Sequence, residues 1–404
     1  MPHTPYSAMD RSLTLDRREF VRALGTGAAV AGGVVLGGPA FAQEPASRPA
    51  LPETNIRDFM AVPRGPHAIP GPFPGRVIRV SDPRVLKGDR VRPRVVRRMF
   101  ADGITQLTGR SMKDSYRLFF EPGDVVGIKV NPVGPPLINT RLELVDAVIE
   151  WLTGCGLPAD QIVVWDRFDA MMHSAGYTEQ RFPGVRIAAL QTMAEGNAFL
   201  GPDGRHISAD NFDPDVFYFV KGVEGKGVRG YKDDEYYLNQ HVFNGENSYF
   251  GTLVTRNLTK IINLAVYKNT GHGISMATKN LGYGALANTG RLHVPLSLRV
   301  NTEVLAAPCL RDRLVLNVID GIRGQYEDGP MLNEQYVYPH HTLYFGTDPF
   351  AMDTVCHHEL VAKRRAMGIT VNEHPRFTDY LRYGEELGLG IADPARITVR
   401  RITA

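Results

Sequence analysis

Two short apolar runs on either side of a helical segment constrain the fold of this chain more than any other feature. Residues 124–130 (DVVGIKV) and 161–166 (QIVVWD) are rich in β-branched side chains and predict strands. Between them, Thr140 and Glu143 have the spacing of a capping box, which predicts the start of a helix, and Gly154 predicts its end. A strand–helix–strand unit makes a right-handed crossover, so the two strands are expected to be parallel.

The same alternation continues further along the chain. Residues 260–266, 313–319 and 341–346 also predict buried strands. The chain has 404 residues, of which 43% are hydrophobic, enough to build one large core. We therefore expect an α/β fold, with a mostly parallel sheet and helices on both faces, in a single domain at 76–404. An irregular insertion at about 192–250 departs from the alternation, and its tyrosines are typical of either a lid or a satellite core.

The N-terminus carries a pattern of its own. Arg17 and Arg18 precede a Gly- and Ala-rich apolar run, and Ala40-Phe41-Ala42 follows it. This arrangement resembles a twin-arginine export signal at 1–42, cleaved after its last alanine; it implies the twin-arginine translocase as a partner and a periplasmic location. The alternative is an amphipathic helix of the folded domain, which the glycines would destabilise. The run is shorter than the roughly 20 residues of a stable membrane span, and the Pro/Gly-rich segment 43–75 predicts an extended arm over the surface.

Charge and cysteine content narrow the classes of partner and cofactor. The net charge of +3 is close to neutral and no dense Lys/Arg stripe is present, so nucleic acid is not expected as a partner. Cys155, Cys309 and Cys356 are far apart and form no C-x-x-C pair. An iron–sulfur cluster usually needs four thiolates, so none is expected from this chain alone, and at most one disulfide can form. Other cofactors and the metal content stay open.

Polar side chains follow each predicted strand. In open α/β sheets, ligands bind at the carboxyl ends of the strands, where loops converge and helix N-termini present free N–H groups. Polar residues at five strand ends therefore predict one shared pocket. The side chains concerned are Lys129, Asn131, Asp166, Arg167, Lys268, His272, Asp320, Arg323 and Asp348.

The segment 268–293 contains lysines, asparagines and closely spaced glycines, without the apolar periodicity of a core element. Ammonium and amide groups beside accessible backbone N–H groups suit a small carboxylate or phosphate ester. A lysine taken singly is by default a solvated surface charge, and no nucleotide-binding loop is present. The predicted anion pocket comprises Lys129, Asn131, Lys268, Lys279, Asn280 and Gly282.

Two histidines are expected to border this pocket. His272 and His293 are candidate acid and base, together with Lys268 and Lys279, because a neutral imidazole near pH 7 can both take and give a proton. With Asp320 the two histidines are also candidate metal ligands, although their separation matches none of the short spacings of zinc motifs. The sequence leaves both roles open.

Two aspartates in the last strong helical segment have different expected roles. Asp348 stands before a proline and predicts a helix N-cap. Asp353 lies about one turn further on, so it either faces the pocket or pairs with Arg364.

Several of these stretches also resemble a known family. The motifs occur in order across residues 124–361, and together they are similar to the domain of unknown function 362 family. This resemblance implies a fold and a site but no reaction, and the ferredoxin-type cluster motifs of some relatives are absent here. The motifs are GIKVN at 127–131, the run 260–285, NTGRLH at 288–293, VIDGIRGQYEDGP at 318–330 and GTDPFAMD at 346–353.

Two functions from different classes are consistent with this pattern. The first is an enzyme that acts on a small anionic substrate, in which a lysine or histidine moves a proton while the other basic groups stabilise negative charge. The second is a periplasmic binding or accessory protein that uses the same pocket without chemistry. A lysine of lowered pKa inside the pocket, together with a closing lid, would favour the enzyme.

Overall fold

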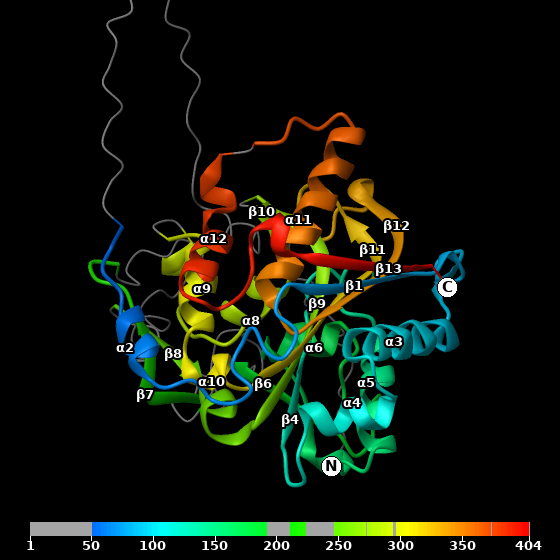
Figure 1. The fold of residues 1–404 in the computed structure, drawn as a ribbon, viewed down its shortest axis with the longest axis horizontal. Helices are drawn as coiled ribbons and strands as arrows, with labels where there is room; N and C mark the ends of the chain where they lie inside the picture. Colours follow the sequence, from blue (N-terminus) through cyan, green and yellow to red (C-terminus); the bar gives the residue numbers. More distant parts are fainter. Residues whose placement is uncertain are drawn as a thin grey trace, which may run out of the picture.

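The computed structural model describes residues 51–191, 211–223, 246–271, 273–293, 296–372 and 374–403. Within them, a nine-stranded sheet crosses the molecule (Figure 1). Neighbouring strands are parallel except at β12, which is antiparallel to β1 and β11, and at β10, which is antiparallel to β9. The predicted mostly parallel α/β fold is therefore confirmed. In spatial order the strands are β13 (Thr398–Thr403), β1 (Arg76–Ser81), β12 (Val337–Gly346), β11 (Leu314–Gln325), β9 (Lys260–Thr270), β4 (Val126–Lys129), β5 (Ile162–Phe168) and β6 (Arg186–Gln191), with β10 (Gly273–Ile274) beside β9.

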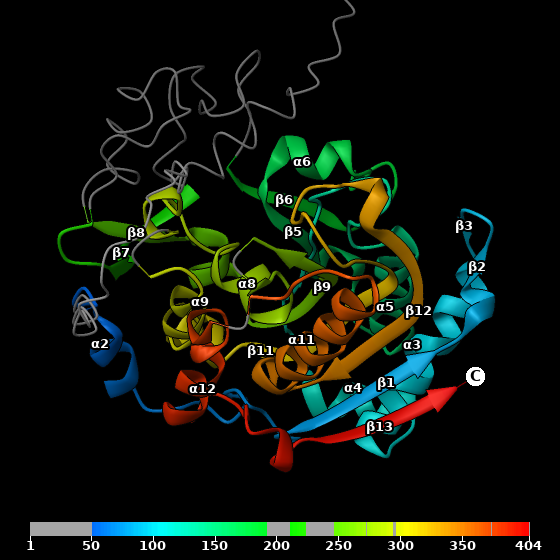
Figure 2. The same cartoon turned by 90° about the horizontal axis from the view of Figure 1, so that it is seen from above.

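Helices cover both faces of this sheet (Figure 2). One face carries α3 (Pro93–Thr108), α4 (Met112–Phe119) and α5 (Leu142–Gly154). The other carries α8 (Ala277–Gly282), α9 (Arg299–Leu305), α11 (Pro349–Ala366) and α12 (Asp379–Glu386). The other described helices and strands are α2 (Ile56–Ala61), β2 (Leu86–Lys87), β3 (Arg90–Val91), α6 (Asp169–Ser174), β7 (Phe212–Phe219), β8 (Asn247–Gly251) and α10 (Pro308–Arg311).

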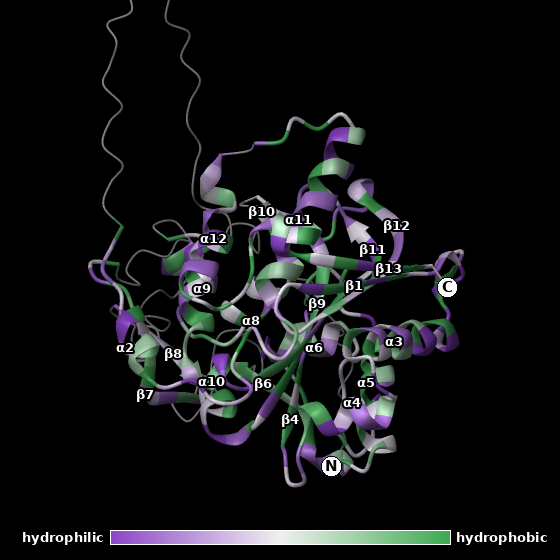
Figure 3. Cartoon of the chain, viewed as in Figure 1, coloured by the Kyte–Doolittle hydropathy of each residue, from purple (hydrophilic) through white to green (hydrophobic). Residues whose placement is uncertain are grey.

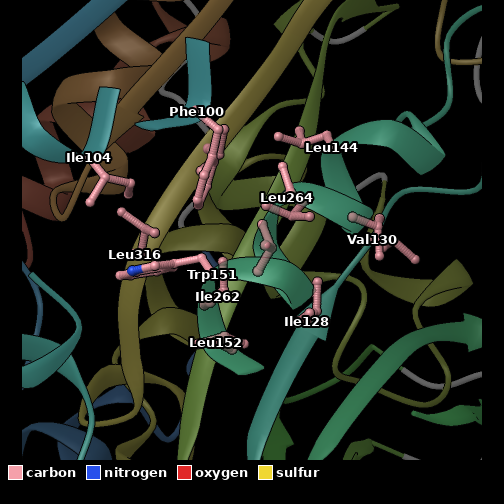
Figure 4. Close-up of a cluster of buried hydrophobic side chains, with 14 of the residues drawn as sticks. Phe100, Ile104, Ile128, Val130, Leu144, Trp151, Leu152, Ile262, Leu264 and Leu316 are labelled. Carbon is pink, nitrogen blue, oxygen red and sulfur yellow. The ribbon is translucent and has the colours of Figure 1, made fainter. Parts of the chain in front are cut away.

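The core on the α3 face follows from the spacing of apolar residues. Buried side chains of α3 recur every three or four residues, so one side of the helix is apolar, and Figure 3 shows hydrophobic and hydrophilic residues alternating along it. Ile128, Ile262 and Leu316, from three neighbouring strands, belong to one buried cluster with Phe100 of α3 and Trp151 of α5 (Figure 4). These strands are buried on both faces, which explains why they read as continuous apolar runs in the sequence.

The β4–α5–β5 unit forms as predicted, with β4 and β5 parallel. The predicted capping box, however, is wrong. The Thr140 hydroxyl donates to the Leu264 carbonyl across 2.7 Å instead of accepting from the helix, and α5 begins one residue later than the box implies, with Arg141 at the N-cap and no side-chain cap. A tertiary partner in β9 therefore overrides the local signal.

The position of Asp348 shows one consequence of the antiparallel β12. As predicted, this side chain caps a helix, accepting from the N–H groups of Phe350 at 3.1 Å and Ala351 at 3.0 Å. It also accepts from the N–H of Gly75, just before β1 begins, at 3.0 Å. Because β12 runs against its neighbours, its carboxyl end lies at the opposite edge of the sheet from those of β4, β9 and β11. The prediction that all five strand ends meet in one pocket is therefore wrong for Asp348.

The segment at 51–75 is more ordered than an extended surface arm. It contains α2, and Phe59 and Ile69 are buried in the core on the α8 and α9 face. The Arg64 guanidinium donates to the Gly388 carbonyl across 2.6 Å, which ties this segment to the C-terminal part of the chain. The export signal predicted at 1–42 lies outside the described residues.

The described part of the predicted insertion contains β7 and β8, which pair with each other as an antiparallel two-stranded sheet apart from the main one. Most of the insertion, including Tyr231, Tyr236 and Tyr237, lies outside the described residues. No helix in the described part of the chain is both long enough and apolar enough to cross a membrane.

Candidate functional site

A small pocket lies at the carboxyl ends of β4, β5 and β9, beside α6 and α8. We call it the lysine pocket; its volume is about 140 Å³. The described residues that line it include four lysine and arginine side chains and one histidine, but a single carboxylate. Of the predicted residues, the pocket is lined by Lys129, Asn131, Asp166, Arg167, Lys268, Lys279, Asn280 and His293. Met171, Ser275, Tyr283, Gly284 and Thr289 also line it.

Lys129 is a fully buried cation of this pocket. Its ammonium forms an ion pair with Asp166 on β5 and donates to the Val130 carbonyl across 2.8 Å. Burial lowers the pKa of Lys129, and the Asp166 carboxylate opposes this shift. A Cβ atom at position 284 would lie 2.3 Å from the Asn280 carbonyl oxygen and 2.5 Å from Cε of Lys129, so glycine is needed here. The ion pair and the role of Gly284 depend on contacts between distant segments, which the sequence alone did not reveal.

A chain of buried amides connects the pocket to the sheet. Asn131 donates to Oδ1 of Asn280 across 3.1 Å, and Asn280 donates to Oδ1 of Asn263 across 2.8 Å. Asn263 in turn donates to Oδ1 of Asn317, its register partner on β11, across 2.9 Å. Asn280 therefore holds α8 against the sheet, and its position fixes that of the neighbouring Lys279.

Lys268 lies at the carboxyl end of β9 and holds the loop that follows β4. Its ammonium donates to Oδ1 of Asn131 at 3.0 Å and to the carbonyls of Val133 at 2.8 Å and Ile138 at 3.4 Å. Burial lowers the pKa of Lys268 to about 7, and the charges of Lys279 and Lys129 contribute to this. Since all three N–H donors have oxygen partners, the side chain is fixed in place.

Lys279 is the lysine with hydrogen-bonding capacity left for a ligand. It is half-buried, and no hydrogen bond or ion pair joins it to another described residue. Its ammonium lies 5.6 Å from the centre of the Tyr283 ring. Burial lowers the pKa of Lys279 to about 8, so an appreciable fraction is neutral near physiological pH.

His293 borders the pocket on the side of Tyr283, with the two ring centres 4.6 Å apart. Its Nδ1 lies 2.9 Å from the carbonyl oxygen of Thr289. A carbonyl can only accept, so Nδ1 carries a proton and donates to it. The other predicted histidine, His272, lies outside the described residues.

Asp320 and Asp353 lie outside the lysine pocket and have structural partners. The Asp320 carboxylate accepts from the N–H groups of Arg141 at 2.8 Å and Ile322 at 3.1 Å, and burial raises its pKa. Asp353 accepts from the N–H groups of Ala277 at 2.8 Å and Thr278 at 3.0 Å, which fixes the start of α8. Burial raises the pKa of Asp353 to about 6.

Two further sequence-based expectations also change. Arg364 forms its ion pair with Glu327, not with Asp353. Gly282 lies within the contact between α8 and α9, where an added Cβ would meet Cα of Asn301 at 3.0 Å, so it serves helix packing. Within the described ranges, no three His, Cys, Asp or Glu side chains come together in a way that could hold a metal, and Cys155, Cys309 and Cys356 are free thiols.

Comparison with known proteins gives one family match. No curated protein matches the chain. Residues 233–358 match the family model described as Domain of unknown function (DUF362). This range contains β9, α8, β11 and β12 and therefore both Lys268 and Lys279. Over this part of its length the chain is similar to a family to which no function is assigned, and the match supports the resemblance seen in the sequence motifs.

Proposed function

We propose that the lysine pocket binds a small molecule carrying a carboxylate or phosphate group, and that the protein is an enzyme acting on it. The observation that carries this proposal is the convergence of Lys129, Lys268 and Lys279 beside a single carboxylate among the described lining residues. Buried ammonium groups with too few counterions are unfavourable, so a bound anion would stabilise them.

Chemistry, as opposed to binding alone, is favoured by Lys279 and His293. An amine with a pKa of about 8 exchanges protons readily near neutral pH. In this proposal Lys279 transfers a proton to or from the bound ligand, with His293 as the second acid–base group. Lys129 and Lys268 stay fixed by their hydrogen bonds and stabilise negative charge that develops on the ligand.

The first test measures binding. Thermal shifts with a panel of small carboxylates and phosphate esters identify the best ligand, and titration calorimetry then compares the wild type with Lys279→Ala. Loss of one charged hydrogen bond is worth about 1.5–3 kcal/mol, or a roughly 10- to 150-fold weaker affinity. Lys113→Ala, at an exposed position in α4, is the matched control and should bind as the wild type does. Equal affinity of Lys279→Ala and the control would refute the assignment.

The second test separates an enzyme from a binding protein. The best ligand is incubated with the protein in D₂O, and proton NMR follows the exchange of its carbon-bound hydrogens. Enzyme-dependent exchange that disappears in Lys279→Ala supports proton transfer. Tight binding without exchange or any change in the ligand would favour the non-catalytic binding protein.

We also propose that the protein is exported by the twin-arginine route and acts in the periplasm. Arg17, Arg18 and the Ala40-Phe41-Ala42 tripeptide support this proposal. Export would deliver an already folded protein, in which the lysine pocket is complete before translocation.

A further inference from the structure

A second hollow lies on the other side of the loop at 130–141, between that loop, the β2–β3 turn and the end of β11. Its volume is about 590 Å³, in the range of pockets that hold cofactor-sized ligands. Arg141, Arg323 and Asn139 line it, together with the first turn of α5. We call this site the arginine pocket; it lies apart from the residues of the proposed function.

The arginine pocket contains a buried guanidinium that forms no ion pair. The Glu143 carboxylate, in the first turn of α5, also lines the pocket and attracts Arg141 electrostatically, but it lies beyond ion-pair distance of it. Arg141 is only 8% exposed, its guanidinium donates to the Pro136 carbonyl, and no carboxylate of the described residues lies within ion-pair distance of it. Asp320 attracts it electrostatically, but that carboxylate accepts from two backbone N–H groups instead. A buried guanidinium with unused donors is unfavourable, so this side of the pocket favours an anion.

A second arginine adds to this charge. Arg323 is 7% exposed and donates to the side chain of Asp89 across 3.2 Å. Asp89 is fully exposed, so water and salt weaken its effect on the pocket. Two nearly buried guanidiniums therefore face the same hollow, and their charges repel each other, as the lowering effect of Arg323 on the pKa of Arg141 indicates.

Asn139 also lines the pocket. It is 5% exposed, and its Nδ2 donates to the Thr140 carbonyl across 3.2 Å. The start of α5 beside it lacks a side-chain cap, and a helix of this length has a partial positive charge there.

We propose that the arginine pocket binds a second small anion. Its phosphate or carboxylate group lies between Arg141 and Arg323 near the start of α5. Lys268 donates to Val133 and Ile138, in the loop that separates the two pockets, so this loop is in contact with both sites. A ligand in the arginine pocket is therefore positioned to act as a co-substrate or effector of the lysine pocket.

The experiment measures anion binding to the full chain by calorimetry and thermal shift. The probes are inorganic phosphate, glycerol 3-phosphate, citrate and tricarballylate. At least one of them should bind, and Arg141→Met should weaken its binding at least about tenfold. Arg110→Met, at an exposed position, is the control and should leave binding unchanged.

The variants also distinguish the two pockets. Binding that survives Lys279→Ala and is lost in Arg141→Met assigns the probe to the arginine pocket, whatever happens at the lysine pocket. If circular dichroism shows that Arg141→Met is unfolded, Arg323→Met takes its place. Equal responses of the wild type and the folded arginine variant to all four probes, including no response in either, would overturn the proposal.

Discussion

Replacing Asp166 by asparagine tests whether the buried Lys129–Asp166 ion pair holds the lysine pocket together. The substitution keeps the size of the side chain and an acceptor oxygen but removes the negative charge. Lys129 retains the Val130 carbonyl at 2.8 Å and Oδ1 of Asn280 at 3.4 Å, so the expected loss is electrostatic. Breaking a buried pair by removing one partner usually lowers the free energy of unfolding by about 3–5 kcal/mol.

The loss in the free energy of unfolding has an upper limit because Lys129 can lose its proton. Neutralising a lysine of ordinary pKa at pH 7 costs about 4.6 kcal/mol, so Asp166→Asn should destabilise the protein by about 2–4 kcal/mol. In the variant the folded state releases this proton at a lower pH than the unfolded state does. Unfolded chains then bind more protons, so stability rises with pH by up to about 1.4 kcal/mol per unit until the ordinary lysine pKa is reached.

Urea denaturation at pH 7 and pH 9 measures the loss of stability and its dependence on pH. The difference between wild type and Asp166→Asn should be smaller at pH 9. Glu179→Gln makes the equivalent neutralisation at an exposed position and should change stability by less than about 0.5 kcal/mol at either pH. If Asp166→Asn behaves like this control, the ion pair contributes nothing and the description of the pocket is wrong.

Three further predictions concern the pH dependence of anion affinity, the role of Gly284 and export. Anion affinity should be highest below pH 7 and fall as the pH rises through about 7 to 8.5, because Lys268 and Lys279 lose their protons there; calorimetry across this range checks it, and a flat profile would contradict it. Gly284→Ala should lower stability by about 1–3 kcal/mol through contact with the Asn280 carbonyl and Lys129, whereas Gly154→Ala, with open space around its Cβ, should not; thermal melts compare them. Replacing Arg17 and Arg18 by lysine should leave precursor in the cytoplasm, and N-terminal sequencing of exported wild type should begin at Gln43; unchanged export of the variant would exclude the twin-arginine route.

Local patterns were sufficient to predict most of the sheet. The strands at β4, β5, β9 and β11 are continuous apolar runs because both of their faces are buried, and the crossover rule gives their parallel direction. β12 has the same kind of sequence, yet it runs the other way. Strand direction at that point depends on the connection from β11 to β12 and on pairing with β1, which no local pattern encodes.

The location of the lysine pocket could also be predicted from the sequence, but the roles of its residues could not. Lysines and asparagines next to glycines after a buried strand indicated the lysine pocket, because strand ends gather at one edge of a sheet. The individual roles depended on distant partners. Asp353 faces the start of α8 and Asp320 the start of α5, since a buried carboxylate is stabilised by free N–H groups at a helix start.

The position of Arg141 could not be predicted from the sequence either. In the sequence it is one arginine before an apolar helix, and nothing marks it as functional. Its burial beside Arg323 follows from packing of the β4–α5 loop against the end of β11, a contact between residues far apart along the chain.

Lysine side-chain NMR tests directly whether Lys268 and Lys279 lie in a buried pocket that binds an anion. In protein labelled at the lysine Cε and Nζ atoms, Lys268→Met and Lys279→Met assign the two signals, and a pH titration gives their pKa values. We expect titration near 7 and 8, with both pKa values rising when the anion found by thermal shift is bound. Lysines that all titrate above about 10, with no response to the anion, would contradict it.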